Sequence, residues 1–179
     1  TKNDFNTLKD QVNKQYDAAK HNDCVPTKLF PLRAKEDYYN KVMYSQLDGE
    51  ANTFELIKKA DNILLDNGKP IPFTVLEKCK KLKETEIEYE ITQLINNCPC
   101  VQVLHLKIGA AVMCNVNLDM DNGICNGSQG IVEDIIKIGE IPNIVVKFSN
   151  GITKCIGHYY WQSEDYPTIS IGQYPLCLC

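Results

Sequence analysis

Nine cysteines and three histidines are the residues of this chain that could hold a metal ion or act as nucleophiles. The closest cysteine pairs, Cys98–Cys100 and Cys177–Cys179, do not have the C-x2-C spacing of a zinc site, and no histidine lies at ligand spacing from them. His21, His105 and His158 have no cysteine or aspartate at the spacing of a catalytic triad. We therefore expect reduced, structural thiols, no metal site and no catalytic residue in this piece.

Loops that bind calcium or nucleotides are also not indicated. Asp119, Asp121 and Asn122 resemble part of a calcium loop, but the glycine and the distal glutamate do not fall at the required positions, so a turn is the better interpretation. The sequence contains no G-x-x-x-x-G-K-[ST] stretch, the loop that cradles the phosphates of a nucleoside triphosphate. The chain alone is therefore expected to have no ATPase activity.

Polar and aromatic side chains in or beside the expected strands could instead contact nucleic acid. Lysine and glutamine can contact phosphates without reading bases, and aromatic rings such as those of 159–161 can stack on bases. Trp161 and one of the tyrosines could alternatively fill a core, because every other strand residue points inward. Arg33, Lys35 and Asn40 follow an expected strand, where ligand contacts and plain solvated surface are both open interpretations. The strand candidates for binding DNA are Lys107, Gln129, Lys147, Lys154, His158 and Tyr160.

Composition indicates a globular protein. The 179 residues are 44% hydrophobic and 23% charged, enough for one ordinary domain or two small ones. A formal charge of -4 argues against a strongly basic nucleic-acid module, although a local basic groove remains compatible with it. No apolar run approaches the length of about 18 residues that spans a bilayer, and the N-terminus is polar. We expect no membrane association and an intracellular location, whether nucleus, cytoplasm or viral replication site. Abundant Asn, Ile and Lys suggest an AT-rich genome, such as that of a large DNA virus or a protist.

The part of the chain before residue 99 is expected to be rich in helix. Its apolar residues recur mostly at steps of three and four, and Asp4 can cap the first helix. One stretch, Ile87–Ile91, alternates with glutamates at a period of two and indicates a strand. The expected elements are helices over 4–20, 34–47 and 73–83, short strands over 27–31 and 87–91, a loop over 49–52 and a turn over 66–70.

After Pro99 the sequence changes to short β-branched and aromatic runs separated by turns, which is typical of a small barrel or sandwich. We expect a barrel from about residue 100 to about residue 165, so the fold class is α+β. The strands are expected over 101–106, 110–116, 131–138, 144–148, 152–156 and 159–161. Because side chains alternate between the two faces of a strand, we expect five residues to share the core of the barrel, namely Val112, Ile131, Val146, Phe148 and Ile156.

Glycine and asparagine mark the turns of this second part. Gly109 and Gly130 permit a close backbone approach or a bulge, and Asn126-Gly127 is a hairpin-turn dipeptide. A positive φ would account for each of these four residues, so we assign them, with Ser128, to turn structure.

Two stretches resemble a known family. LFPLRAKEDYYNKVM, residues 29–43, is similar to the strand, turn and helix of helicases of the PIF family and their RecD-like relatives. LHLKIGAAVMCNVNLDMDNGICNGSQGIVEDI, residues 104–135, resembles the family stretch L-x-L-K-x-G-A-x-V-M followed by a turn and N-G-x-x-G-x-V. VVKFSNG at 145–151 and Tyr160-Trp161 resemble the hairpin and the strand that follow.

The resemblance implies a piece of a superfamily-one DNA helicase that uses ATP and Mg²⁺ and moves 5′ to 3′ on single-stranded DNA. Residues 1–98 would belong to the second RecA-like motor domain with a helical insert, and 99–179 to an SH3-like barrel of the 2B type with a strand returning to the motor. The ATP-binding half and the last motifs would lie in the remainder of the motor, its expected partner. A non-catalytic SH3-like protein-interaction module and a catalytically dead structural subunit are the alternatives.

Overall fold

The computed structural model describes residues 28–179, in one unit that ends at Tyr38 and a second from Tyr39 to Cys179. The helix expected over 4–20 lies outside the described residues. The strand expected over 27–31 is wrong for its described part, because no neighbouring strand pairs with it; the amides of Lys35 and Glu36 instead bond to the carbonyl oxygen of Leu32 and begin a helix. Within residues 28–179, no helix is both long and apolar enough to cross a bilayer.

Three helices are described: α2 (Arg33–Ser45), α3 (Phe73–Cys79) and α4 (Glu84–Asn97). They confirm the helix expected over 34–47 and most of the one over 73–83. The strand expected at Ile87–Ile91 is wrong, because these two isoleucines are also four residues apart and lie on one half-buried face of α4. The carboxylate of Glu86 accepts a hydrogen bond of 2.8 Å from the backbone nitrogen of Lys83 and so fixes the start of this helix.

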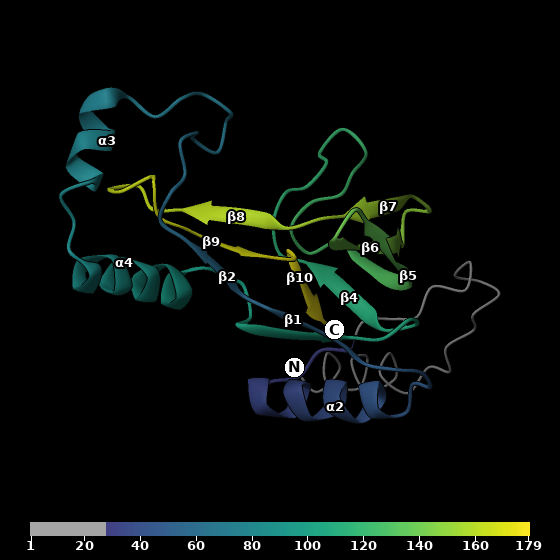
Figure 1. Cartoon of the computed structure of the whole chain (residues 1–179). Helices are drawn as coiled ribbons and strands as arrows, with labels where there is room; N and C mark the ends of the chain where they lie inside the picture. The colour runs from purple at the N-terminus through teal and green to yellow at the C-terminus, as the bar shows by residue number, and fades with distance from the viewer. Residues whose placement is uncertain (1–27) are drawn as a thin grey trace, which may run out of the picture. The chain divides into compact units, whose positions relative to one another are not determined.

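The strands form three antiparallel sheets (Figure 1). β1 (Asn52–Glu55) pairs with β3 (Val103–Leu106). β9 (Ser170–Gln173) lies between β2 (Ile57–Lys59) and β8 (Tyr159–Gln162). The largest sheet has the order β10-β4-β5-β6-β7; its strands are β4 (Ala111–Cys114), β5 (Gln129–Ile138), β6 (Ile141–Phe148), β7 (Thr153–Ile156) and β10 (Leu176–Leu178).

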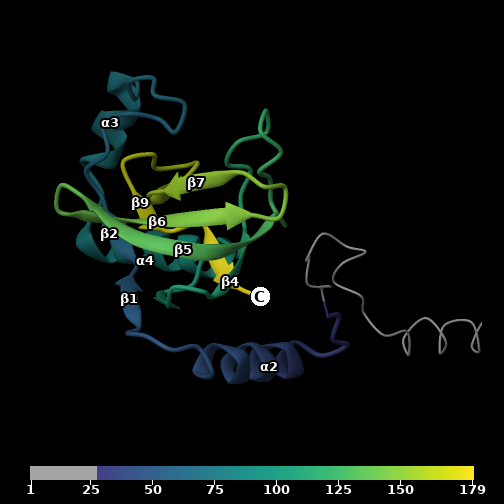
Figure 2. The same ribbon diagram turned by 90° about the vertical axis from the view of Figure 1, so that its right-hand side faces the viewer.

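The class is therefore mixed α and β, as expected, whereas a closed barrel is not found among the described strands. The five-stranded sheet is open, with β10 and β7 at its edges. Its strands β5, β6 and β7 lie side by side in Figure 2. β8 was expected in the same barrel, but it pairs with β9 instead. Strands from before and after residue 98 also pair, since β1 joins β3 and β2 joins β9.

The main core lies on one face of the five-stranded sheet. Val112, Val146, Phe148 and Ile156 are buried in it, which confirms four of the five expected residues. Ile131 is 50% exposed, so its placement in the core is wrong. It lies opposite Ala111 and Lys147 on the outer face, and its neighbour Val132 points inward. The side chains of β5 alternate between the two faces of the sheet as expected, but Val132 rather than Ile131 faces the core.

Two different structural reasons explain the glycines after residue 99, namely a positive φ and a close approach of a neighbouring strand. Gly109 and Gly127 have φ values of 86° and 92° and form turns. Gly130 has no positive φ; a Cβ placed there would lie 2.7 Å from both the carbonyl oxygen of Lys147 and the Cγ1 of Val146. A close approach of β6 therefore explains this glycine, rather than a turn.

Candidate nucleic-acid interface

A groove lies beside β8 and the loop that follows β2. Its volume is about 550 Å³. The side chain of Gln162 joins the two walls, because its Nε2 donates to the carbonyl oxygen of Leu64 at 2.7 Å. The residues that line the groove are Lys59, Asp61, Asn62, Ile63, Leu64, Leu65, Asp66, His158, Tyr159, Tyr160 and Gln162.

Tyr160 lies across the sheet, and Gly172 is the reason it can. A Cβ at Gly172 would come within 2.5 Å of the Tyr160 ring, so only glycine leaves the ring this position. Lys59 in β2 places its Nζ 4.4 Å from the centre of the same ring, a cation–π contact. Lys59 is not among the residues predicted from the sequence; the register of β2 with β9 brings it to the face that carries Tyr160.

His158 lies at the end of this groove as a neutral ring. Its centroid is 4.3 Å from that of Tyr174 and 6.4 Å from that of Tyr160. Burial lowers the pKa of His158 below its usual 6.5, and the positive charge of Lys59 lowers it further. At neutral pH this histidine can therefore donate or accept a hydrogen bond, but it does not carry a charge for a phosphate.

Tyr159 and Trp161 alternate with Tyr160 along β8, and Tyr159 also lines the groove. Their rings meet edge to face with centroids 4.9 Å apart, and Tyr159 is 37% exposed. Trp161 is half-buried and lies outside the main core. The aromatic run thus supplies an exposed ring at the rim of the groove, rather than core residues of the five-stranded sheet.

Two residues that the sequence suggested as DNA contacts instead form hydrogen bonds within the fold. Lys107 donates from its Nζ to the carbonyl oxygen of Leu47 at 2.8 Å and lies 5.1 Å from the centre of the Tyr44 ring. Asn40 donates from its Nδ2 to the carbonyl oxygen of Leu178 at 3.4 Å. Arg33 and Lys35 are exposed on the first turn of α2, in the unit that ends at Tyr38.

Lys147 and Lys154 lie on opposite faces of the five-stranded sheet. Lys154 is paired in register with Val146, a core residue, whereas Lys147 is paired with Thr153 on the outer face. Lys147 is 3.8 Å from Glu133, and Gln129 is half-buried in β5. The structure therefore brings His158 and Tyr160 together at one groove, but it does not gather the predicted lysines into one surface.

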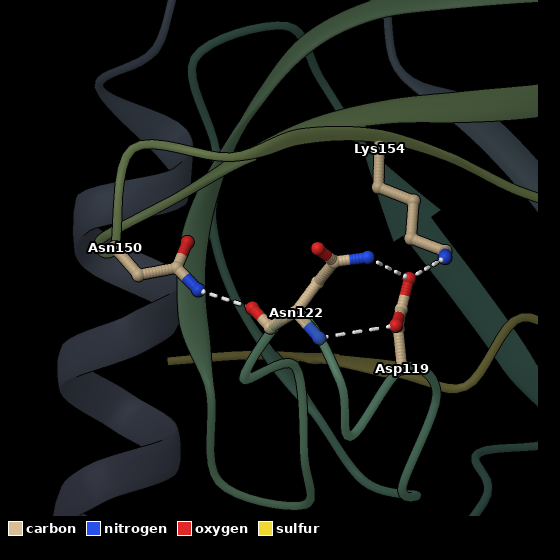
Figure 3. A network of polar contacts seen from close by, with 4 residues as sticks. All are labelled: Asp119, Asn122, Asn150 and Lys154. Carbon is tan, nitrogen blue, oxygen red and sulfur yellow. Dashed lines mark hydrogen bonds and ion pairs between the residues drawn. The ribbon is translucent and has the colours of Figure 1, made fainter.

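Lys154 closes a network around the loop between β4 and β5 (Figure 3). Its Nζ lies 2.5 Å from Oδ2 of Asp119, which also accepts from Nδ2 of Asn122 at 3.0 Å. The Nδ2 of Asn150 donates to the carbonyl oxygen of Asn122 at 3.0 Å. This segment is a turn, as the sequence indicated, and Lys154 is a structural clamp for it.

The clamp makes stability depend on acid pH. The hydrogen bonds from Lys154 and Asn122 lower the pKa of Asp119 below its usual 3.8. Its contribution is therefore fully present above pH 3.8 and is lost as pH falls through the lower, folded-state pKa. We expect Asp119→Asn to lower the urea midpoint of unfolding at neutral pH. As the solution is acidified, the difference in midpoint between this variant and the unmodified chain should become smaller. An equal loss at neutral and at strongly acidic pH would contradict this assignment.

Residues 91–135 match the domain family described as "DNA helicase Pif1, 2B domain". The chain is 37% identical over 84 residues to the ATP-dependent DNA helicase PIF1 of Homo sapiens. The aligned residues make up 45% of this chain and 13% of the relative. It is 31% identical over 112 residues to the PIF1 helicase of Emericella nidulans, covering 63% of this chain and 12% of the relative. The chain thus spans only about an eighth of the length of these curated relatives.

Solved structures share the fold. The Pif1 helicase of Candida albicans matches with a TM-score of 0.56 at 22% identity, over 94% of this chain and 37% of that one. Unliganded Pif1 from Bacteroides matches with a TM-score of 0.51 at 24% identity, over 82% and 37%. The fold and the matched segment are therefore similar to those of PIF1 DNA helicases. The chain is similar to a part of these PIF1 helicases, in agreement with the resemblance seen in residues 104–135.

Proposed function

We propose that this chain is the part of an ATP-dependent 5′–3′ DNA helicase that helps to hold single-stranded DNA during strand separation, in replication, repair or recombination. The match of residues 91–135 to the Pif1 2B domain is the observation that carries the proposal. The curated relatives are named as ATP-dependent DNA helicases, and one structural neighbour is described as unwinding forked duplex DNA. The parent protein acts inside the cell.

ATP and Mg²⁺ would be held elsewhere in the parent protein. This sequence has no phosphate-binding loop, and residues 28–179 contain no cluster of three or more His, Cys, Asp or Glu side chains that fits a metal ion. The residues present do not fit the nucleotide, so we assign no step of ATP hydrolysis to them. Their role in the parent is to bind DNA and to contact the remainder of the motor.

The five-stranded sheet would be the SH3-like 2B element of the parent, and the sheet of β2, β9 and β8 would connect it to the motor. The order β10-β4-β5-β6-β7 and the shared core support this assignment. In this arrangement the groove beside β8 lies where the 2B element meets the connecting sheet.

Single-stranded DNA fits the chemistry of this groove. The exposed ring of Tyr159 offers a stacking surface, and Ile63 and Leu64 are exposed apolar residues of the groove wall. Lys59 can leave the Tyr160 ring for a phosphate, which would uncover a second ring. Because Asp61 and Asp66 also line the groove, binding should be weak and should have little sequence preference.

Fluorescence anisotropy with a labelled oligothymidine at low and moderate salt tests the proposal. We expect a dissociation constant of roughly tens of micromolar or weaker, near the non-specific range. Tyr159→Leu should weaken binding about tenfold, because a base–aromatic stack contributes about 1–3 kcal/mol. Tyr89→Leu is the matched control, since Tyr89 is 62% exposed on α4 and lies outside the groove.

The alternative is a non-catalytic module for binding other proteins. Absence of DNA binding even at low salt would favour it over the proposed DNA contact. Equal binding by the Tyr159 and Tyr89 variants would keep DNA binding but remove the groove as its location.

A further inference from the structure

Four lysines lie within six residues at the C-terminal end of α3, in the sequence Lys78-Cys79-Lys80-Lys81-Leu82-Lys83. Cys79 is buried and Leu82 is half-buried, whereas all four lysines are exposed. The two apolar residues therefore anchor the segment, and the charged residues face solvent. We name residues 78–83 the lysine segment.

The backbone of the lysine segment is ordered by hydrogen bonds. The amide of Lys80 bonds to the carbonyl oxygen of Leu76 at 3.0 Å, and that of Lys81 bonds to the carbonyl oxygen of Lys78 at 3.2 Å. In the part of the chain that is described, no carboxylate lies within ion-pair distance of these lysines. Glu77 precedes the segment, and glutamates 84, 86, 88 and 90 follow it in α4; of these, Glu86 caps that helix and Glu90 accepts from Ser163. The segment thus presents positive charge on an ordered backbone, with no ion pair among the described residues, in a chain whose net charge is -4.

The lysine segment begins where the groove beside β8 ends. The Nζ of Lys78 is 4.5 Å from the centre of the Tyr166 ring, in the turn between β8 and β9. Gln162 lines the groove, and its Nε2 also donates to the carbonyl oxygen of Pro167 in that turn at 3.0 Å. β8 runs toward α3 in the ribbon (Figure 1). One turn of chain therefore connects the aromatic groove to the positive charge.

We propose that the lysine segment is a contact for the phosphate backbone of the single-stranded DNA whose bases enter the groove. This inference rests on the proposed function and adds a residue set to it. Phosphates need only positive charge without a fixed hydrogen-bond pattern, which exposed lysine side chains supply. Lys107 and Lys154 are bound within the fold, whereas the lysine segment adds four exposed charges to Lys59 of the groove.

The test measures oligothymidine binding by the 179-residue chain between roughly 50 mM and 200 mM salt. Lys80→Gln with Lys81→Gln removes two charges from the lysine segment. Lys41→Gln with Lys137→Gln removes two exposed charges elsewhere and serves as the control with the same net charge. We expect about a tenfold loss of affinity for the first pair only, with a salt slope shallower by about 1.4, because each phosphate contact on a single strand contributes about 0.7.

Two results would overturn the inference, and they differ in what else they affect. If both variant pairs bind like the unmodified chain, the lysine segment is solvated surface, while the DNA contact at the groove stands. If the unmodified chain does not bind at low salt, the DNA contact proposed for the groove fails as well. Circular dichroism of both variant pairs verifies that each is folded.

Discussion

Replacing Gln173 with leucine is expected to lower the free energy of unfolding by about 3 kcal/mol, because it would leave buried polar groups without partners. Gln173 is fully buried in β9. Its Nε2 donates to the carbonyl oxygens of Phe54 and Val101, both at 3.2 Å, and its Oε1 accepts from the amide of Tyr174 at 3.0 Å. One side chain thus connects β9 to segments about 70 and 120 residues earlier in the chain, and the apolar gain from leucine offsets only part of the loss.

Urea unfolding followed by circular dichroism measures this effect. Gln102→Leu is the control, because Gln102 is an exposed glutamine and should change stability by less than about 0.5 kcal/mol. A Gln173→Leu chain as stable as that control would mean that water replaces the lost hydrogen bonds, and that the buried amide does not determine how β9 is held.

Adding one methyl group at Gly130 is expected to cost about 2 kcal/mol. The Cβ of Gly130→Ala would lie 2.7 Å from the backbone carbonyl oxygen of Lys147, in the centre of the five-stranded sheet. A backbone atom in a sheet cannot move aside without disturbing its neighbours, so β5 and β6 must separate, and overpacking of this kind costs about 1–3 kcal/mol. Thermal unfolding should show a lower midpoint.

Gly157→Ala is the matched control for this substitution. Its Cβ would meet only the end of the Asn143 side chain at 3.1 Å, which can rotate away. Neither glycine has a positive φ, so the comparison isolates space from backbone strain. Equal destabilisation by the two substitutions would show that strand propensity, rather than the close approach of β6, determines the cost at Gly130.

Local signals determined several elements correctly. The turn at Ser149–Gly151 connects β6 to β7 as its composition indicates, with Gly151 at a φ of 88°. The helix expected over 34–47 and the long strand after Gly130 also follow from short-range patterns. Ile87–Ile91 was misassigned because a stretch of five residues with apolar ends fits a strand and a helix equally well. The contact between α4 and β9 is tertiary, and no local pattern contains it.

The candidate site was predicted only in part, for a similar reason. Tyr160 and His158 were identifiable as polar and aromatic residues in a strand, but Lys59 lies 101 positions before Tyr160 and meets it only because β2 and β8 both pair with β9. Lys107, Lys147 and Lys154 looked alike in the sequence. Their partners Leu47, Glu133 and Asp119 are supplied by distant segments, so their roles could not be read from residue type.

The sequence by itself determined the resemblance to PIF-family helicases, the absence of a phosphate-binding loop and the sites where the chain turns, because these depend on residues that are close together in the chain. The tertiary structure decided which strands share a sheet, which face of each strand is buried and which lysines are free. Pairing between strands depends on contacts between residues far apart in the chain, and a shift of one position reverses the face of every side chain. The arrangement of the groove and the lysine segment therefore emerged only once β2, β8 and β9 were placed side by side.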